Sequence, residues 1–421
     1  KRRLSETFVR RERKRARITV IAGILSLVAA YLFDARYELK SDLYPANVCY
    51  NIALAFQRTA QTQHYAETSN DFTFQAKTIR PEKNREVYVM VIGETSRAAN
   101  WSIYGYNRNT NPELTKIKGL TAFSHVLTES NTTHKSVPML MSSVTAHDFN
   151  SIYRQKGIIT AFKEAGYRTA FFSNQRYNHS FIDFFGKEAD ICDFIKEDTG
   201  NGGYNPSDDE LLKLVAAELA ENVSKQFIVL HTYGSHFNYR ERYPADNAFF
   251  LPDFPVDAEL KYKDNLINAY DNSIRYTDNF LARLIRMLQE QDIDAAMLYT
   301  SDHGEDIFDD DRHLFLHASP VPSYYQIHVP FLIWMSDNYR KNYPDLFKNA
   351  EINRQKNISS SASFFQTMLE LGGIDTPSRN DSLSVINASY TEKNRVYLND
   401  HNEARSLNDI GMREEDFTML Q

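Results

Sequence analysis

The chain has 421 residues, of which 42% are apolar and 24% are charged, so its composition is that of a globular protein and excludes disorder, collagen and coiled coil. Its two cysteines, Cys49 and Cys192, allow at most one disulfide and exclude a disulfide-rich scaffold. The formal charge of −7 is unevenly divided, because residues 1–17 carry nine Lys/Arg and two Glu and the rest of the chain is acidic. This distribution argues against a nucleic-acid partner and is typical of a membrane protein with a basic flank.

Residues 18–33, ITVIAGILSLVAAYLF, are uncharged and predict a transmembrane helix about 24 Å long. The positive-inside rule places residues 1–17 in the cytosol as a basic flank and the chain after Asp34 outside. A cleaved signal peptide is the alternative, with a cleavage site at Val28-Ala29-Ala30. The first residue is Lys, so we expect upstream sequence, with room for further membrane helices.

Residues 34–84 form an amphipathic and linker segment. Within it, residues 42–65 mix apolar and polar positions at helical spacing, which predicts a helix on the membrane surface or an ordinary surface helix. Residues 66–84 are polar and are predicted to be a linker.

Residues 85–421 alternate short apolar runs with helical stretches, which predicts one catalytic domain with a doubly wound, mostly parallel α/β sheet and helices on both faces. The predicted strands are 87–92, 168–172, 226–231, 295–300, 329–334 and 395–398. The predicted helices lie near 158–165, 208–222, 265–290 and 359–371.

Acidic and imidazole side chains follow three of these strands. They are Glu94 after the first, His231 and His236 after the third, and Asp302, His303 and Glu305 after the fourth. Ligands bind outside the carboxyl ends of the strands in open α/β sheets, so we expect these groups to converge. Oxygen and imidazole ligands suit Zn²⁺, with Mn²⁺ as an alternative.

Residues 130–143, SNTTHKSVPMLMSS, read as a loop that enters a helix. Thr132 or Thr133 near its first turn is either a plain helix cap or a nucleophile. A hydroxyl at this place experiences the helix dipole, and a bound metal would lower its pKa.

The segment IGETSRAANWSIYGYNRNTNPEL (92–114), followed by NTTHKSVPM, HTYGSH and TSDHGE, resembles the membrane-anchored phosphoethanolamine transferases of the alkaline phosphatase and sulfatase superfamily. The resemblance covers residues 86–335. It implies transfer of phosphoethanolamine from phosphatidylethanolamine to lipid A or the lipopolysaccharide core. It also implies a bacterial inner membrane protein whose catalytic domain lies in the periplasm, with residues 18–33 as the last of several membrane helices.

The resemblance further implies roles for individual residues. Zinc ligands would be Glu94, Thr133, Asp302 and His303, and Glu305 would support these ligands from behind or bind a second metal. Thr133 would accept phosphoethanolamine, while His236 and His317 would contact the phosphoryl group or a second zinc and carry protons. Substrate-contacting residues would be Asn174, Gln175, Arg176, His179 and His231, with Arg176 or His179 in place of a lysine of the family.

The chain departs from the family at two positions, because Glu129 and Met139 stand where many members have cysteines that form a disulfide. This argues against the disulfide-rich lipid A branch, and the segment HTYGSHFNYRERYP (231–244) resembles the members that modify core sugars. Two rival functions remain. One is a phosphoglycerol transferase of the lipoteichoic-acid-synthase type, and the other is a non-catalytic membrane-anchored binding module.

Overall fold

The computed structural model describes residues 6–33, 38–80, 84–196 and 205–420. Within these ranges the chain divides into two compact units, one that ends at Glu67 and one that begins at Thr68. The first unit consists of helices α1 (Glu6–Phe33), α2 (Leu39–Asp42), α3 (Ala46–Gln63) and the start of α4 (Tyr65–Thr68).

Helix α1 contains the predicted apolar stretch and extends it toward the N-terminus through basic residues of the flank. Its segment Thr7–Leu32 contains an 18-residue window with a mean hydropathy of 1.6, which by length and composition is enough to cross a membrane. Helix α3 exposes Val48, Ile52 and Phe56 at a spacing of four residues, which places them on one helical face. Its predicted place on a membrane surface stays a prediction.

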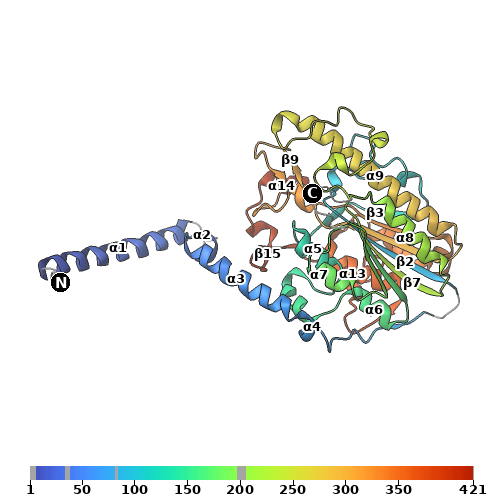
Figure 1. The fold of residues 1–421 in the computed structure, drawn as a ribbon, viewed down its shortest axis with the longest axis horizontal. Helices are drawn as coiled ribbons and strands as arrows, with labels where there is room; N and C mark the ends of the chain where they lie inside the picture. Colours follow the sequence, from blue (N-terminus) through green and yellow to red (C-terminus); the bar gives the residue numbers. More distant parts are fainter. Residues whose placement is uncertain (1–5, 34–37, 81–83, 197–204, 421) are drawn as a thin grey trace. The chain divides into compact units, whose positions relative to one another are not determined.

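The second unit is built on a seven-stranded sheet with the strand order β3-β11-β8-β2-β7-β5-β6 (Figure 1). The bounds are β2 (Glu86–Gly93), β3 (Leu120–Phe123), β5 (Arg168–Ser173), β6 (Ile191–Phe194), β7 (Lys225–His231), β8 (Asp294–Ser301) and β11 (Phe331–Met335). Strands β8, β2, β7, β5 and β6 pair in parallel, and β11 pairs antiparallel with both of its neighbours. The carboxyl ends of the five parallel strands therefore share one edge.

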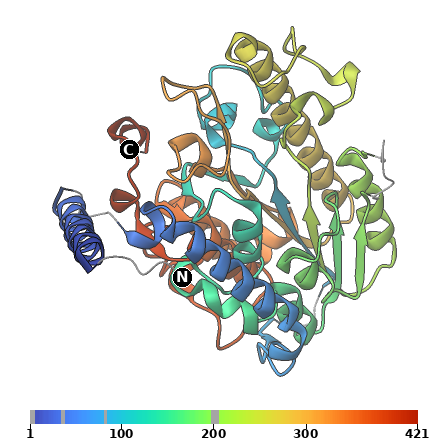
Figure 2. The ribbon, with the colours of Figure 1, turned by 60° about the vertical axis from the view of Figure 1, so that its left-hand side comes forward.

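Helices cover both faces of this sheet (Figures 1 and 2). One layer contains α5 (Thr133–Leu140), α6 (Ile158–Glu164), α7 (Phe181–Gly186) and α13 (Ser360–Leu371), and the other contains α8 (Asp209–Ala220) and α9 (Lys263–Gln289). All eight residues of β2 are buried. Val87, Val89 and Val91 pack in a core cluster with apolar residues of α8 and α9, whereas Tyr88 contacts Tyr167 and Tyr339. The predicted α/β fold, mostly parallel with helices on both faces, is confirmed.

Short ribbons and helices complete the unit. The ribbons are β1 (Lys77–Thr78) with β13 (Ile374–Asp375), β4 (His125–Leu127) with β12 (Asn357–Ser359), β9 (Asp306–Ile307) with β10 (Phe315–Leu316), and β14 (Val396–Leu398) with β15 (Ala404–Ser406). The remaining α-helices are α10 (Tyr324–Ile327), α11 (Asp337–Asn342), α12 (Pro344–Asn353) and α14 (Glu414–Met419). The strand predicted at 395–398 thus forms outside the main sheet, since its hydrogen-bonding partner is the nearby β15.

Part of the segment predicted as a linker is packed into the second unit. Strand β1 pairs with β13, and Phe74 is buried. Arg80 donates to the hydroxyls of Tyr88 at 2.6 Å and Tyr339 at 2.7 Å and to the carbonyl oxygen of Glu370 at 2.9 Å. Polarity in this stretch therefore reflects buried hydrogen bonds as well as exposure to solvent.

Replacing Arg80 by Ala should lower the free energy of unfolding by on the order of 3 kcal/mol, because it leaves two buried hydroxyls and a carbonyl without their donor. Denaturant unfolding of the full chain in detergent, followed by the fluorescence of the buried Trp101 and Trp334, would measure the loss. The matched control is Lys77→Ala, since Lys77 is exposed and makes a surface ion pair with Asp375. Equal stability of the Arg80 variant and the control would contradict the packing described here.

Candidate active site

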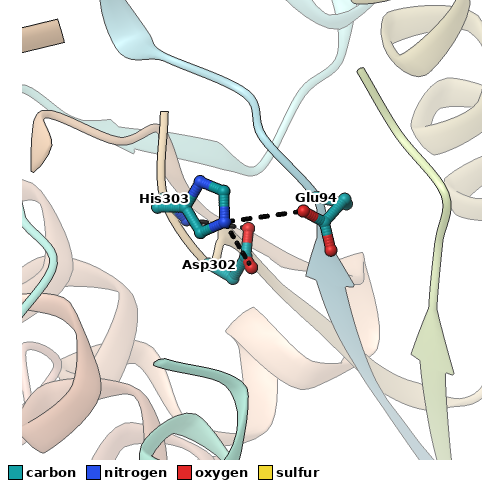
Figure 3. Close-up of side chains that lie close together, drawn as sticks. All are labelled: Glu94, Asp302 and His303. Atoms are coloured by element: carbon teal, nitrogen blue, oxygen red, sulfur yellow. Dashed lines mark hydrogen bonds and ion pairs between the residues drawn. The ribbon is translucent and has the colours of Figure 1, made fainter. Parts of the chain in front are cut away.

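Two neighbouring strands deliver an acidic and imidazole cluster to the carboxyl edge of the sheet. Glu94 follows β2, and Asp302 and His303 follow β8, whose Ser301 pairs with Gly93. The ligand atoms of the three side chains lie within 4.8 Å of one another (Figure 3). All three residues are buried. The pairing of β2 with β8 fixes their positions relative to one another.

The protonation of His303 follows from its hydrogen bonds. Its Nδ1 lies 2.9 Å from the carbonyl oxygen of Gly304, which can only accept, so Nδ1 carries the proton. The lone pair of Nε2 then faces Asp302 Oδ2 at 3.3 Å and Glu94 Oε1 at 3.6 Å (Figure 3). Three electron-pair donors converge without a donated proton between them, which is the arrangement that a zinc ion requires.

The electrostatics of this cluster favour a cation. Burial, followed by the charge of Asp302, raises the pKa of Glu94 well above its ordinary value. Burial also raises the pKa of Asp302 to about 6 and lowers that of His303 well below its ordinary value. Each shift reflects the cost of burying charge without a partner, and a bound divalent cation would offset that cost.

Thr133 is the first residue of α5, and its hydroxyl faces the cluster. Its Oγ1 lies 3.1 Å from His303 Nε2 and 3.2 Å from Glu94 Oε1. The helix cap position belongs to Thr132. Thr133 therefore does not serve as the plain helix cap that was its alternative reading, and its oxygen lies where the three ligand atoms converge.

Thr95 orients both carboxylates, and nothing in its sequence position predicts this role. Its hydroxyl donates to Glu94 Oε1 at 2.7 Å, and its backbone N–H donates to Asp302 Oδ1 at 3.0 Å. The residue has a φ of 57°, a left-handed conformation that is strained for a β-branched side chain. The GET motif points to Glu94 as a functional residue. The contacts of Thr95, which follows it, form only when the folded backbone brings Asp302 close.

A cavity of about 240 Å³ opens beside Thr133. Of the predicted substrate residues, Gln175, Arg176 and His231 line it, and so does His236. Gln175 Nε2 donates to Glu94 Oε2 at 3.3 Å. Its amide therefore links the cavity to the metal-type cluster, which is the group formed by Glu94, Asp302 and His303. The other lining residues are Ser173, Asn178, Ser180, Ile182, Asp183, Lys196 and Tyr233.

Two predicted substrate residues lie elsewhere. Asn174 is buried and donates to Asp208 Oδ1 at 2.8 Å and to the carbonyl oxygen of Pro206 at 3.0 Å, so its amide braces loops behind the cavity. His179 is exposed, with its ring against Tyr177, and does not line the cavity. The departure is confined to this residue, because its neighbours Asn178 and Ser180 both line the cavity.

The remaining predicted catalytic residues form a histidine group next to the cluster. The ring of His317 lies 4.2 Å from that of His303 and 6.2 Å from that of His236. Glu305 is buried and lies outside the three-residue cluster, with its Oε2 3.5 Å from His317 Nδ1. Burial lowers the pKa of His236 to about 4, and its Nδ1 lies 2.6 Å from the carbonyl oxygen of Phe237. His236 is thus a neutral base with Nε2 unprotonated.

Glu129 and Met139, which replace the expected cysteines, are both buried. Cys49 and Cys192 are free thiols. Burial raises the pKa of Glu129 to about 7. In the unfolded chain this carboxyl loses its proton near pH 4.5, so the unfolded state binds fewer protons than the folded state between these values and stability falls as pH rises.

The free energy of unfolding of the wild-type chain should fall by on the order of 3 kcal/mol between about pH 4.5 and 7, because Glu129 loses its proton. Glu129→Gln should not show this fall. Denaturant unfolding at pH 5 and pH 8 would measure the difference between the variant and the wild-type chain. The exposed Glu290→Gln serves as control and should keep the wild-type pH dependence. A wild-type pH dependence in the Glu129 variant would show that its carboxyl is not held neutral.

Comparison with known proteins agrees with this geometry. The Sulfatase family model matches residues 86–374. The chain is 32% identical over 294 residues to the Kdo(2)-lipid A phosphoethanolamine 7''-transferase of Escherichia coli K12, which covers 68% of this chain and 50% of that protein. It is 26% identical over 318 residues to phosphoethanolamine transferase EptC of Escherichia coli O18:K1:H7, which covers 73% of this chain and 54% of that protein. The chain therefore spans about half the length of the curated relatives it matches.

Solved structures show the same fold. The soluble domain of lipooligosaccharide phosphoethanolamine transferase A from Neisseria meningitidis has a TM-score of 0.65 at 26% identity, covering 74% of this chain and 95% of that one. The periplasmic domain of Escherichia coli EptC, in complex with Zn, has a TM-score of 0.73 at 23% identity. The match covers 82% of this chain and 98% of that one.

Proposed function

The chain belongs to the Sulfatase family, and we propose that it transfers phosphoethanolamine from phosphatidylethanolamine to an envelope glycolipid, either lipid A or the lipopolysaccharide core. One observation carries the proposal. The Thr133 hydroxyl lies within hydrogen-bond distance of both Glu94 and His303, at a buried donor set suited to zinc. The relatives named as phosphoethanolamine transferases support the choice of group.

Glu94, Asp302 and His303 would hold the zinc ion, with Thr133 as a further oxygen ligand. When bound, zinc would lower the pKa of the hydroxyl and neutralise charge on the transferring group. Thr95 holds the two carboxylates in place through its hydroxyl and N–H groups. Gln175 and Arg176 line the space where the phosphoryl group would lie.

In the first step, a bond forms between Thr133 Oγ1 and phosphorus while the bond from phosphorus to the diacylglycerol oxygen breaks. The hydroxyl proton of Thr133 passes to diacylglycerol, which leaves as the alcohol. In the second step, an acceptor oxygen attacks the same phosphorus, and the bond from phosphorus to the Thr133 oxygen breaks. The unprotonated Nε2 of His236 takes the acceptor proton and, with His317 as the second proton carrier, returns it to the Thr133 oxygen, which leaves as the hydroxyl.

The first unit supports a proposal for where the protein is located. We propose that α1 is a membrane anchor, the last of several, with residues 1–17 in the cytosol and the unit from Thr68 onward in the periplasm of a bacterium with an inner membrane. The basic flank of residues 1–17 and the uncharged run of residues 18–33 support this orientation. Anchoring keeps the catalytic unit near both lipid substrates and raises their effective concentration.

Mass spectrometry of envelope glycolipids tests the function. A Gram-negative host without its own phosphoethanolamine transferases would express either the wild-type chain or Thr133→Ala. We expect one added phosphoethanolamine unit with the wild-type chain and none with the variant. No added unit with the wild-type chain would refute the function, and an added phosphoglycerol unit would favour the lipoteichoic-acid-synthase type of transferase instead.

A further inference from the structure

A lysine that belongs to none of the motifs above lies in the same cavity as Thr133. Lys196 follows β6, the edge strand of the sheet, so it emerges at the same carboxyl edge as the metal-type cluster. The preceding backbone is fixed, because Ile195 N–H donates to the carbonyl oxygen of Ser173 at 2.9 Å. Lys196 and Thr133 both line the 240 Å³ cavity.

Tyr233 positions the lysine. Lys196 Nζ lies 3.3 Å from the centre of the Tyr233 ring, and the Arg242 guanidinium carbon lies 4.0 Å from the same centre. The ring of His236 stacks on Tyr233, with centroids 5.1 Å apart and an interplanar angle of 19°. One aromatic side chain therefore links two cations to a histidine beside the Thr133 hydroxyl.

Three cations, Lys196, Arg176 and Arg242, lie close together at this wall of the cavity. Burial, then the charges of Arg242 and Arg176, lowers the pKa of Lys196 to about 8. The acidic groups that face it are Asp208 and Glu241. Asp208 accepts from the N–H groups of Tyr233 and Gly234 and from Asn174, and Glu241 pairs with Arg242. An anion in the cavity would relieve the remaining repulsion between the cations.

We propose that Lys196, held on Tyr233 beside Arg176 and Arg242, binds a phosphate group of the substrate in the Thr133 cavity. The proposal rests on the proposed function and adds a substrate-orienting residue to it. A wall with three cations repels an ethanolammonium group, so the amine of the transferred unit would point away from Lys196. The phosphate comes either from the donor phosphodiester or from a phosphorylated acceptor.

Inorganic phosphate is the first probe, added to the zinc-loaded full chain in detergent and followed by titration calorimetry. Lys196→Ala should weaken phosphate binding about tenfold or more, and Lys196→Arg should restore most of it. The matched control is Lys187→Ala, because Lys187 also stacks on a tyrosine, with Nζ 4.1 Å from the Tyr177 ring centre, but does not line the cavity. Wild-type binding by Lys196→Ala, or equal weakening by the control, would overturn the proposal.

The pH profile separates a charge contact from a structural role. Wild-type phosphate affinity should fall above pH 8 as Lys196 loses its proton, whereas Lys196→Arg should keep its affinity to a higher pH. Identical profiles for the two chains would also overturn the proposal, because other titrating groups of the site are common to both.

Kinetics identify the source of the phosphate. If the donor supplies it, Lys196→Ala raises the KM for phosphatidylethanolamine in formation of the Thr133 adduct. If the acceptor supplies it, the variant forms the adduct normally and raises the KM for a phosphorylated acceptor. Unchanged constants for both substrates would overturn the proposal. A wild-type chain that forms no adduct refutes the proposed function, and the phosphate titration still decides the role of Lys196.

Discussion

Replacing Thr133 by Ala should reduce phosphoethanolamine transfer by at least about 10⁴-fold, which is the scale of loss when a covalent nucleophile is removed. The hydroxyl is 3.1 Å from His303 Nε2 and 3.2 Å from Glu94 Oε1, so no neighbouring side chain replaces its oxygen at the same point. Release of diacylglycerol from phosphatidylethanolamine by the purified full chain would measure the loss.

Two variants control for effects on the fold. Thr133→Ser keeps the oxygen and should retain measurable transfer. Thr132→Ala changes the neighbouring cap residue, which faces Ser130 Oγ at 3.1 Å rather than the cluster, and should leave most of the activity. Substantial transfer by Thr133→Ala would assign the nucleophile to another residue.

Replacing His303 by Ala should weaken zinc binding by more than about 100-fold, because it removes one of the proposed direct ligands, whose loss costs more than that of an outer partner. Thr95→Val tests the outer partner itself. It removes the hydroxyl that holds Glu94 while it keeps the N–H that holds Asp302, so we expect a smaller loss of about 10- to 100-fold.

Competition with a zinc chelator, followed by metal analysis of the purified chain, would rank these variants. His313→Ala is the control, because His313 is exposed and outside the cluster. We expect the order wild type equal to His313→Ala, then Thr95→Val, then His303→Ala. If His303→Ala bound zinc with wild-type affinity, zinc would not bind at this site.

The sequence predicts the fold and the centre of the site because both depend on local signals. The continuous apolar run of β2 predicts a strand buried on both faces, and Glu94 directly after it inherits its position from that strand. Asp302 and His303 follow β8 in the same way, and the parallel pairing of β2 with β8 brings the three together. The apolar run of residues 18–33 likewise predicts most of α1.

Other features depend on contacts that no local pattern carries. Asn174 and Gln175 are adjacent, yet the bends after β5 direct one amide to Asp208 and the other to Glu94. Thr95 requires a left-handed backbone, and Lys196 requires the edge strand β6 to reach the same sheet edge. The stretch from Thr68 to Arg80 is polar in sequence, yet it packs in the second unit, where Arg80 donates buried hydrogen bonds to Tyr88 and Tyr339.

Peptide mass spectrometry of the full chain tests the central claim most directly. The zinc-loaded chain would be incubated with phosphatidylethanolamine without acceptor, quenched in acid and digested. We predict that the peptide containing Thr133 gains the mass of one phosphoethanolamine unit, and that addition of a glycolipid acceptor removes it. Release of diacylglycerol without an adduct on Thr133, or an adduct on another residue, would contradict the account.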